Sequence, residues 1–430
     1  MQGLYFSGIF KSFFAVSYKE RLLMVRAALL IGIFFDFARF LPLQSDIVVI
    51  KYSPYIFTLI FLLYNLRSAI PNHQGREEQV WLLFYLLCCL ASACLSLLSD
   101  PGYFGQSGLA SMLFNNAKIL FLGSFSLSML CVRWTEASFS DFLKTTLYVV
   151  LTFGFIRMLL LGLGVLDPHP VEINNRFAGI QVPVFVSIFS EPSYAASFIF
   201  AIALCLFATQ FNRKKQLFNK GDFFRLIFPT ILSCALTSSL SGYIYAISLT
   251  AMVLWKGGLG IAFSLIGCIL VFSLCIMWWN PEIVEIALKR ILLLISGEDG
   301  SASKRIIMSW VGVAYQEGWG LFFGIGGRDV TEFVLSVYPD HPRRGQIWNI
   351  FAINQTAFGL LGTTAIIFVI GRATLTWWPL GVGFVLIGFS RGGGFGPGVW
   401  AYLALILISS SLVAERRKRF KAVNEFVIGN

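Results

Sequence analysis

The sequence predicts an all-α integral membrane protein of about twelve transmembrane helices, within limits of about ten to thirteen, with one large outer loop. Of its 430 residues, 57% are hydrophobic and only 13% are charged, and the mean hydropathy is +0.75. Soluble domains carry about 25% charged residues. We therefore expect residues 1–430 to form a single polytopic membrane domain, with no separate soluble domain.

The apolar stretches of the chain have roughly the length that crossing a bilayer requires. They cover residues 26–41, 47–65, 80–98, 108–132, 143–166, 188–209, 224–239, 241–255, 259–279, 349–370, 375–389 and 398–413. The stretches at 224–239 and 241–255 are shorter than ~17 residues, which indicates tilted or broken helices.

The basic residues fix the predicted orientation. When the N-terminus is placed inside, most of the 33 lysines and arginines fall in inner segments. The outer segments other than the large loop hold three, which are Arg39, Arg176 and Arg391. Because cytoplasmic loops carry the excess of positive charge, we expect both termini to be cytoplasmic. The large loop at 280–348 then lies on the outer side, and loops of this length escape the charge rule.

The segment before the stretch at 188–209 is dense in polar residues. Arg176 lies in it, and Glu191 directly precedes Pro192. Proline suits the first turn of a helix, and a carboxylate suits the positive end of the helix dipole. Glu191 is therefore either a helix cap alone, or a cap that also acts as a general base at the membrane surface.

Two features interrupt the apolar stretches. Arg157 lies in the outer half of its stretch, and ionisable residues inside spans usually face a cavity. The hydroxyl-rich run from Thr237 to Tyr243 separates two short stretches. It either lines a substrate cavity or forms a tight outer hairpin.

The large loop carries Arg305, Arg328, Arg343 and Arg344 close to the membrane. Guanidinium groups are preferred partners of phosphate and pyrophosphate oxygens, so these arginines suit an anionic lipid head group. The alternative is that they pair with acidic residues of the same loop. The glycines of Gly324–Gly327 favour a turn over a phosphate-binding loop, and His341 is a second candidate base.

Taken in order, these motifs resemble the bacterial O-antigen polymerase and O-antigen ligase group of Wzy- and WaaL-like membrane glycosyltransferases. The resemblance covers roughly Arg176 to Gly362. The matching pieces are Arg176-Phe-Ala-Gly with Glu191-Pro-Ser, the Thr-x-Ser-x-Ser-Gly break, Arg305 with the Trp310 helix leading to Gly324-x-Gly, and Asn349 followed by Phe358-Gly-Leu-Leu-Gly362. Group members often have an arginine where this chain has Ser241. Ligases tend to place a histidine directly before the asparagine, where this chain has Trp348, so the polymerase interpretation is favoured.

The resemblance implies a GT-C-like fold in the bacterial inner membrane and a site that faces the periplasm. It implies a metal-independent glycosyltransferase without a cofactor, which polymerises polyprenyl-pyrophosphate-linked oligosaccharides into O-antigen or another surface polysaccharide. Membrane lipid is an expected partner, a chain-length regulator and a flippase are further candidates, and nucleic acid is not expected. The alternatives are a ligase that transfers glycan to a lipid A-core acceptor, and a polysaccharide-lipid flippase or transporter.

The resemblance and the residue patterns together give a set of candidate site residues. Glu191 and His341 are the candidate catalytic residues. The candidate pyrophosphate- or substrate-binding residues are Arg176, Arg305, Arg328, Arg343, Arg344, Asn349 and Arg157. A metal site is not expected, because the only histidines, His73, His169 and His341, are far apart in the sequence.

Overall fold

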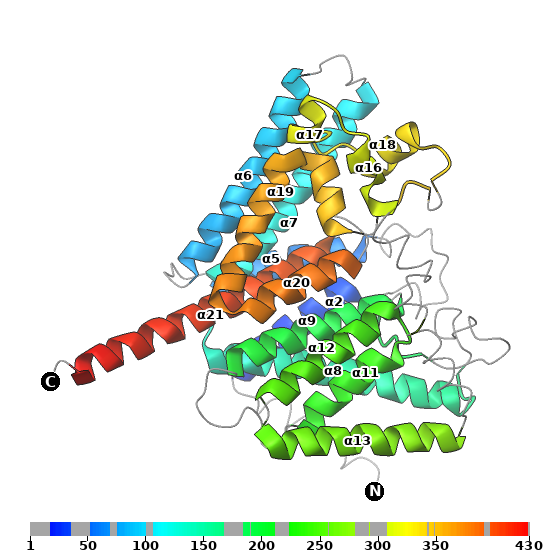
Figure 1. Cartoon of the computed structure of the whole chain (residues 1–430). Coiled ribbons are helices and arrows are strands. Elements are labelled where there is room, and N and C mark those ends of the chain that lie inside the picture. Colours follow the sequence, from blue (N-terminus) through cyan, green and yellow to red (C-terminus); the bar gives the residue numbers. More distant parts are fainter. Residues whose placement is uncertain are drawn as a thin grey trace, which may run out of the picture.

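The computed structural model describes most of the chain as helices (Figure 1). The described residues are 18–35, 52–68, 75–99, 106–166, 184–189, 191–210, 223–256, 258–279, 292, 308–341, 344–347, 349–390 and 396–428. No β-strand occurs within these ranges. The predicted all-α class is therefore confirmed for the described part of the chain.

Each predicted apolar stretch overlaps a helix of the described part of the chain. These helices are α2 (Tyr18–Phe34), α5 (Ser53–Ser68), α6 (Arg76–Ser99), α7 (Gln106–Cys131), α8 (Glu136–Gly162), α9 (Pro192–Gln210), α11 (Phe228–Leu236, extended at its start by the π-helical turn η3, Phe223–Ile227), α12 (Leu240–Lys256), α13 (Gly258–Trp279), α19 (Ile350–Thr376), α20 (Trp378–Ser390) and α21 (Pro397–Ile428). Within the described residues, 6 helices are long and apolar enough to cross a membrane, namely α6, α7, α8, α9, α19 and α21. The larger number of spans remains a prediction.

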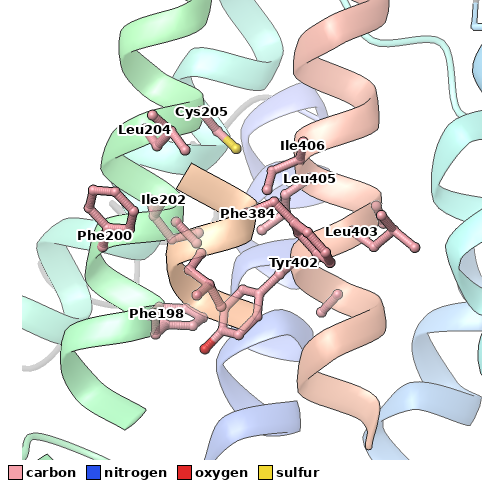
Figure 2. Packing of buried hydrophobic residues seen from close by; sticks show 14 of the residues in the cluster. Phe198, Phe200, Ile202, Leu204, Cys205, Phe384, Tyr402, Leu403, Leu405 and Ile406 are labelled. Carbon is pink, nitrogen blue, oxygen red and sulfur yellow. The ribbon is translucent and has the colours of Figure 1, made fainter. Parts of the chain in front are cut away.

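Helix α9 and the first half of α21 form the centre of the bundle. Both are apolar on all sides and buried on all sides, as expected of helices surrounded by other helices. Figure 2 shows buried side chains of these helices and of α20 packed together, among them Phe198, Phe384 and Tyr402. Outer helices instead expose large apolar side chains, such as Leu159, which suits contact with lipid.

One end of the bundle collects charged side chains, and we call it the charged end. Arg416 of α21 forms an ion pair with Glu136 of α8, and it donates to the Thr209 carbonyl oxygen at 2.7 Å. Arg372 of α19 is paired with Glu77 of α6, and so is Lys418 at 3.3 Å. Arg372, Arg416 and Lys418 all belong to the predicted inner segments, so the charge pattern and the packing agree.

The opposite end carries the described part of the large loop, and we call it the loop end. This part forms η4 (Met308–Trp310), α16 (Val311–Ala314), α17 (Trp319–Phe323) and α18 (Val330–Val337), which gather beside α6 and α19 (Figure 1). Ser92 and Ser96 of α6 bind the backbone of this region. Because Glu77 and Ser96 are ~29 Å apart along a helix, the two ends are separated by about the thickness of the hydrocarbon core.

The predicted orientation can be tested by labelling single cysteines in a background without native cysteines. Ser336 on α18 and Val423 on α21 are both exposed. We expect a membrane-impermeant maleimide to label Ser336→Cys in intact cells whose outer envelope admits the reagent, and to label Val423→Cys only after lysis. The reverse pattern would mean that the loop end faces the cytoplasm.

Candidate functional site

Helix α19, which contains the predicted span at 349–370, is sharply bent at the loop end. Gly359 has φ 61° and ψ −160°, which is not helical. The Asn354 amide donates to the Thr363 hydroxyl at 3.3 Å. Residues nine apart in a straight helix are ~13.5 Å apart along the axis, so α19 folds back on itself at Gly359. The apolar run gave no sign of this break, because hydropathy does not show whether a helix is straight or bent.

The bend frees backbone carbonyls of α19 that a membrane interior would not tolerate unpaired. Loop-end groups satisfy them. The pairs are Gln316 Nε2 to Thr356 O at 2.8 Å, Ile325 N to Thr356 O at 3.0 Å, Gly327 N to Ala357 O at 3.0 Å and Ser92 Oγ to Phe358 O at 3.1 Å. The hydrogen bonds at the bend therefore hold the loop end against α6 and α19.

The glycine-rich run forms the turn that the sequence predicts. Gly324, Gly326 and Gly327 have φ values of 65°, 66° and 79°, which favour glycine. A Cβ on Gly324 would lie 2.5 Å from the Ala357 carbonyl carbon, so the two backbones cross in close contact. The N–H groups of Ile325 and Gly327 donate to α19, and a phosphate-binding role for them is therefore not supported.

A cavity of about 350 Å³ opens at the loop end between the end of α6 and the segment from α16 to α18. Its volume is typical of small-ligand pockets, which span ~300–1,000 Å³. Arg328 is partly buried in its wall, and its Nε donates to the Ile325 carbonyl oxygen at 3.1 Å. The other lining side chains include Ser96, Gln316, Glu317, Trp319 and Phe333.

Among the described residues, Arg328 is the one predicted site residue that lines this cavity. The sequence reasoning missed Gln316, Glu317 and Trp319, although they lie between Tyr315 and the glycine turn in a run of polar and aromatic residues. That run was a usable signal, since polar groups that alternate with aromatic ones are common in ligand sites.

His341 is buried, with 5% of its surface exposed. Its Nδ1 accepts from the Gly345 backbone N–H at 3.1 Å, and its Nε2 lies 3.4 Å from the Met308 carbonyl oxygen. These two contacts assign the tautomer with hydrogen on Nε2. Because both ring nitrogens are engaged by backbone, the contacts favour a structural role that ties the start of the described loop to its end.

We expect His341→Ala to lower the melting temperature of the purified protein, with a loss of about 1 kcal/mol per hydrogen bond. The glycan polymerisation that the sequence leads us to expect should stay near normal in the folded fraction. Size-exclusion chromatography after heating measures the change in stability, and polymer length on gels measures the change in activity. A variant that is stable but inactive would restore the predicted catalytic role of His341.

Asn349 and Arg344 lie in the connection between α18 and α19. Asn349 is fully buried and caps α19, because its Oδ1 accepts from Phe351 N at 2.9 Å and from Ala352 N at 3.3 Å. Its Nδ2 has no hydrogen-bond acceptor within the described part of the chain. Arg344 is exposed and has a positive φ of 49°, so its guanidinium is accessible to a ligand in solvent.

Glu191 directly precedes α9, and Pro192 opens the helix as predicted. The Glu191 carbonyl oxygen accepts from Tyr194 N at 3.1 Å and from Ala195 N at 3.2 Å. Its carboxylate accepts from the Ser193 hydroxyl at 3.3 Å, and it is half-buried. Within the described residues, no backbone N–H of α9 donates to this carboxylate. The helix start is therefore bonded to the carbonyl oxygen of Glu191, and the carboxylate does not cap it.

The remaining predicted residues are placed only in part. Arg157 is partly buried on α8, near the end of the helix. Arg176, Arg305 and Arg343 lie outside the described residues. None of the residues that line the cavity comes from α8 or α9, so the described contacts join neither Arg157 nor Glu191 to Arg328.

The hydroxyl-rich run from Thr237 onward forms a tight hairpin between α11 and α12. The Thr237 hydroxyl donates to the Cys234 carbonyl oxygen at 2.7 Å, and Ser239 Oγ accepts from Gly242 N at 3.0 Å. A Cβ on Gly242 would lie 2.0 Å from Thr237 Oγ1. Of the two interpretations that the sequence left open, the contacts support the hairpin.

No protein-family model matches the sequence, and no curated protein matches it. Within the described residues, no three His, Cys, Asp or Glu side chains are grouped so that they could hold a metal ion. The function is therefore inferred from the residues and their geometry.

Proposed function

We propose that this protein is a membrane glycosyltransferase that polymerises polyprenyl-pyrophosphate-linked oligosaccharide units at the outer face of a bacterial inner membrane. The observation that carries the proposal is the position of the cavity. It lies at the end of the bundle opposite the charged end, and Arg328 lines it. If the charged end is cytoplasmic, as the charge rule requires, the cavity opens where lipid-linked glycans are presented.

The proposed reaction requires a hydroxyl of the acceptor sugar to attack the anomeric carbon of the donor sugar. The new carbon–oxygen bond forms while the bond from that carbon to a pyrophosphate oxygen breaks. The pyrophosphate leaves with the bonding electron pair, and the hydroxyl proton passes to a base. Glu191 is the proposed base, because its half-buried carboxylate is not used to cap α9.

Pyrophosphate is a good leaving group at neutral pH, so its departure needs neutralisation of charge more than a proton donor. Arginines supply that neutralisation without a metal ion. Arg344 is exposed at the loop end and suits this role. Arg176, Arg305 and Arg343 belong to the same proposal on sequence grounds alone, as does a cavity-facing role for Arg157.

The rival functions predict different products. A ligase would join finished polymer to a lipid A-core acceptor, so its loss would leave long polymer on the lipid carrier. A flippase would move lipid-linked units, so its loss would trap them on the inner leaflet. A chain-length regulator and a flippase are proposed protein partners of the polymerase.

Deletion of the gene tests the proposal directly. We expect deleted cells to carry single lipid-linked repeat units on the outer leaflet and no long polymer. Gel analysis of the surface glycan and mass spectrometry of the extracted lipids give both readouts, and the intact gene on a plasmid should restore polymer. Long polymer that persists on the lipid carrier would favour the ligase instead.

A further inference from the structure

We infer that the cavity at the loop end is a saccharide-binding subsite that receives an uncharged sugar ring, and that it does not hold the pyrophosphate of the lipid-linked substrate. This inference rests on the proposed function, because it names the part of the substrate that the cavity takes. Three observations support it, and each concerns a different property of the wall.

The first observation is the balance of charge in the wall. Among the described lining residues, Arg328 carries the positive charge and Glu317 carries the negative charge. A pyrophosphate would gain from the guanidinium and lose to the carboxylate, so a cavity with cancelling charges is a poor site for it. A sugar uses both groups, because its hydroxyls donate to the carboxylate and accept from the guanidinium.

The second observation is an aromatic surface at the cavity. One side of the Trp319 ring is stacked on Phe323, with centroids 5.6 Å apart and planes 10° apart. Even so, Trp319 remains 65% exposed. A pyranose ring has an apolar face of C–H groups, and its contact with an indole removes apolar surface from water. Phe333 adds a second aromatic group to the wall.

The third observation is an unsatisfied acceptor in the wall. Gln316 is 9% exposed, and its Nε2 is committed to the Thr356 carbonyl oxygen at 2.8 Å. Its Oε1 finds no donor within the described part of the chain. Buried polar atoms are rarely left unpaired, so this acceptor in the wall suits a ligand that donates hydrogen bonds better than one that only accepts them. Sugar hydroxyls do, and a fully ionised pyrophosphate does not.

The same geometry assigns separate tasks to the two described arginines of the loop end. Arg328 is held in the wall by its hydrogen bond to the Ile325 carbonyl oxygen, and it binds the sugar. Arg344 is exposed and is not among the described residues that line the cavity, so its guanidinium remains available for the pyrophosphate. The sequence left both arginines as candidates for the pyrophosphate or for another part of the substrate, and the inference divides these two roles between them.

The test uses the purified full-length protein in lipid nanodiscs and saturation-transfer NMR. The probe is the mixture of saccharides released by mild acid from the polyprenyl-pyrophosphate lipids of the same cells, and inorganic pyrophosphate is the competitor. We expect saturation to pass to sugar ring protons, and an excess of pyrophosphate to leave this signal unchanged. Trp319→Ala and Glu317→Gln should each raise the Kd at least ~10-fold, which corresponds to about 1.4 kcal/mol.

Two variants provide matched controls. Trp378→Ala removes another exposed tryptophan, 53% accessible, from the start of α20. Glu332→Gln neutralises an exposed carboxylate on α18 that does not line the cavity. Both should bind the saccharides as the unchanged protein does. Absence of saccharide binding, displacement by pyrophosphate, or equal loss in test and control variants would overturn the inference.

The outcomes for the inference and for the proposed function are separable. If deleted cells lose polymer but Trp319→Ala binds saccharide normally, the polymerase stands and the cavity assignment fails. If the protein binds saccharide through Trp319 and Glu317 but deleted cells still make polymer, the cavity assignment stands and the polymerase proposal fails.

Discussion

We expect Glu191→Gln to abolish polymerisation, with a loss of ~10²–10⁴ in rate, while the protein stays folded and abundant. The substitution keeps the size of the side chain and removes its negative charge and its basicity. The geometry makes this a sharp test. The Glu191 carbonyl oxygen accepts the first hydrogen bonds of α9, whereas its carboxylate accepts only a side-chain hydrogen bond from Ser193 within the described residues. The cost to stability is therefore limited to the dipole interaction, about 0.3–1 kcal/mol.

Two further variants separate chemistry from structure. Glu191→Asp keeps a carboxylate but withdraws it by one methylene, so we expect partial activity. Ser193→Ala removes the hydroxyl that contacts the carboxylate, so we expect a smaller loss than with Glu191→Gln. Rates of polymer extension in membranes, normalised to protein level, give the comparison. A stable Glu191→Gln protein with a normal rate would end the assignment of Glu191 as the base and return attention to His341.

The helices and the position of Glu191 could be predicted because their signals are local. Apolar runs of bilayer length gave each long helix, and Pro192 beside Glu191 gave the start of α9. The charge pattern also anticipated that Arg372, Arg416 and Lys418 would share one end of the bundle. Each of these features depends on residues that are close in sequence or on a rule that applies loop by loop.

The cavity and the bend could not be predicted in the same way because they depend on contacts between distant segments. The Ser96 hydroxyl donates to the Gly324 carbonyl oxygen, although more than half of the chain length separates the two residues. No sequence pattern near Ser96 indicates this contact. The bend in α19 has a local sign in Gly359, but glycine is common in membrane helices. Only the crossing with the turn at Gly324 makes a left-handed residue necessary there.

We expect Gly359→Ala to produce the largest loss of stability among single alanine substitutions at the loop end. A Cβ at this position would lie 2.3 Å from the Phe322 carbonyl carbon and 2.4 Å from its oxygen. The residue also has a φ of 61°, where a side chain adds about 1–2 kcal/mol of strain. Forced overlap in a packed region adds about 1–3 kcal/mol. The turn would separate from α19 and break the hydrogen bonds that satisfy the freed carbonyls.

Gly371→Ala is the matched control, because Gly371 lies in the regular second part of the same helix and its Cβ would meet nothing within 4 Å. Alanine favours the helix there by about 0.5–1 kcal/mol, so this variant should melt at the same temperature as the unchanged protein or higher. Thermal-shift measurements on both proteins in the same detergent decide the matter. Saccharide binding should fall with Gly359→Ala and not with Gly371→Ala, because Gly324 and Ile325 belong to both the crossing and the cavity wall. Equal melting temperatures would show that the two backbones can separate without cost, and the bend would then be an adaptable joint in α19 that does not hold the cavity in shape.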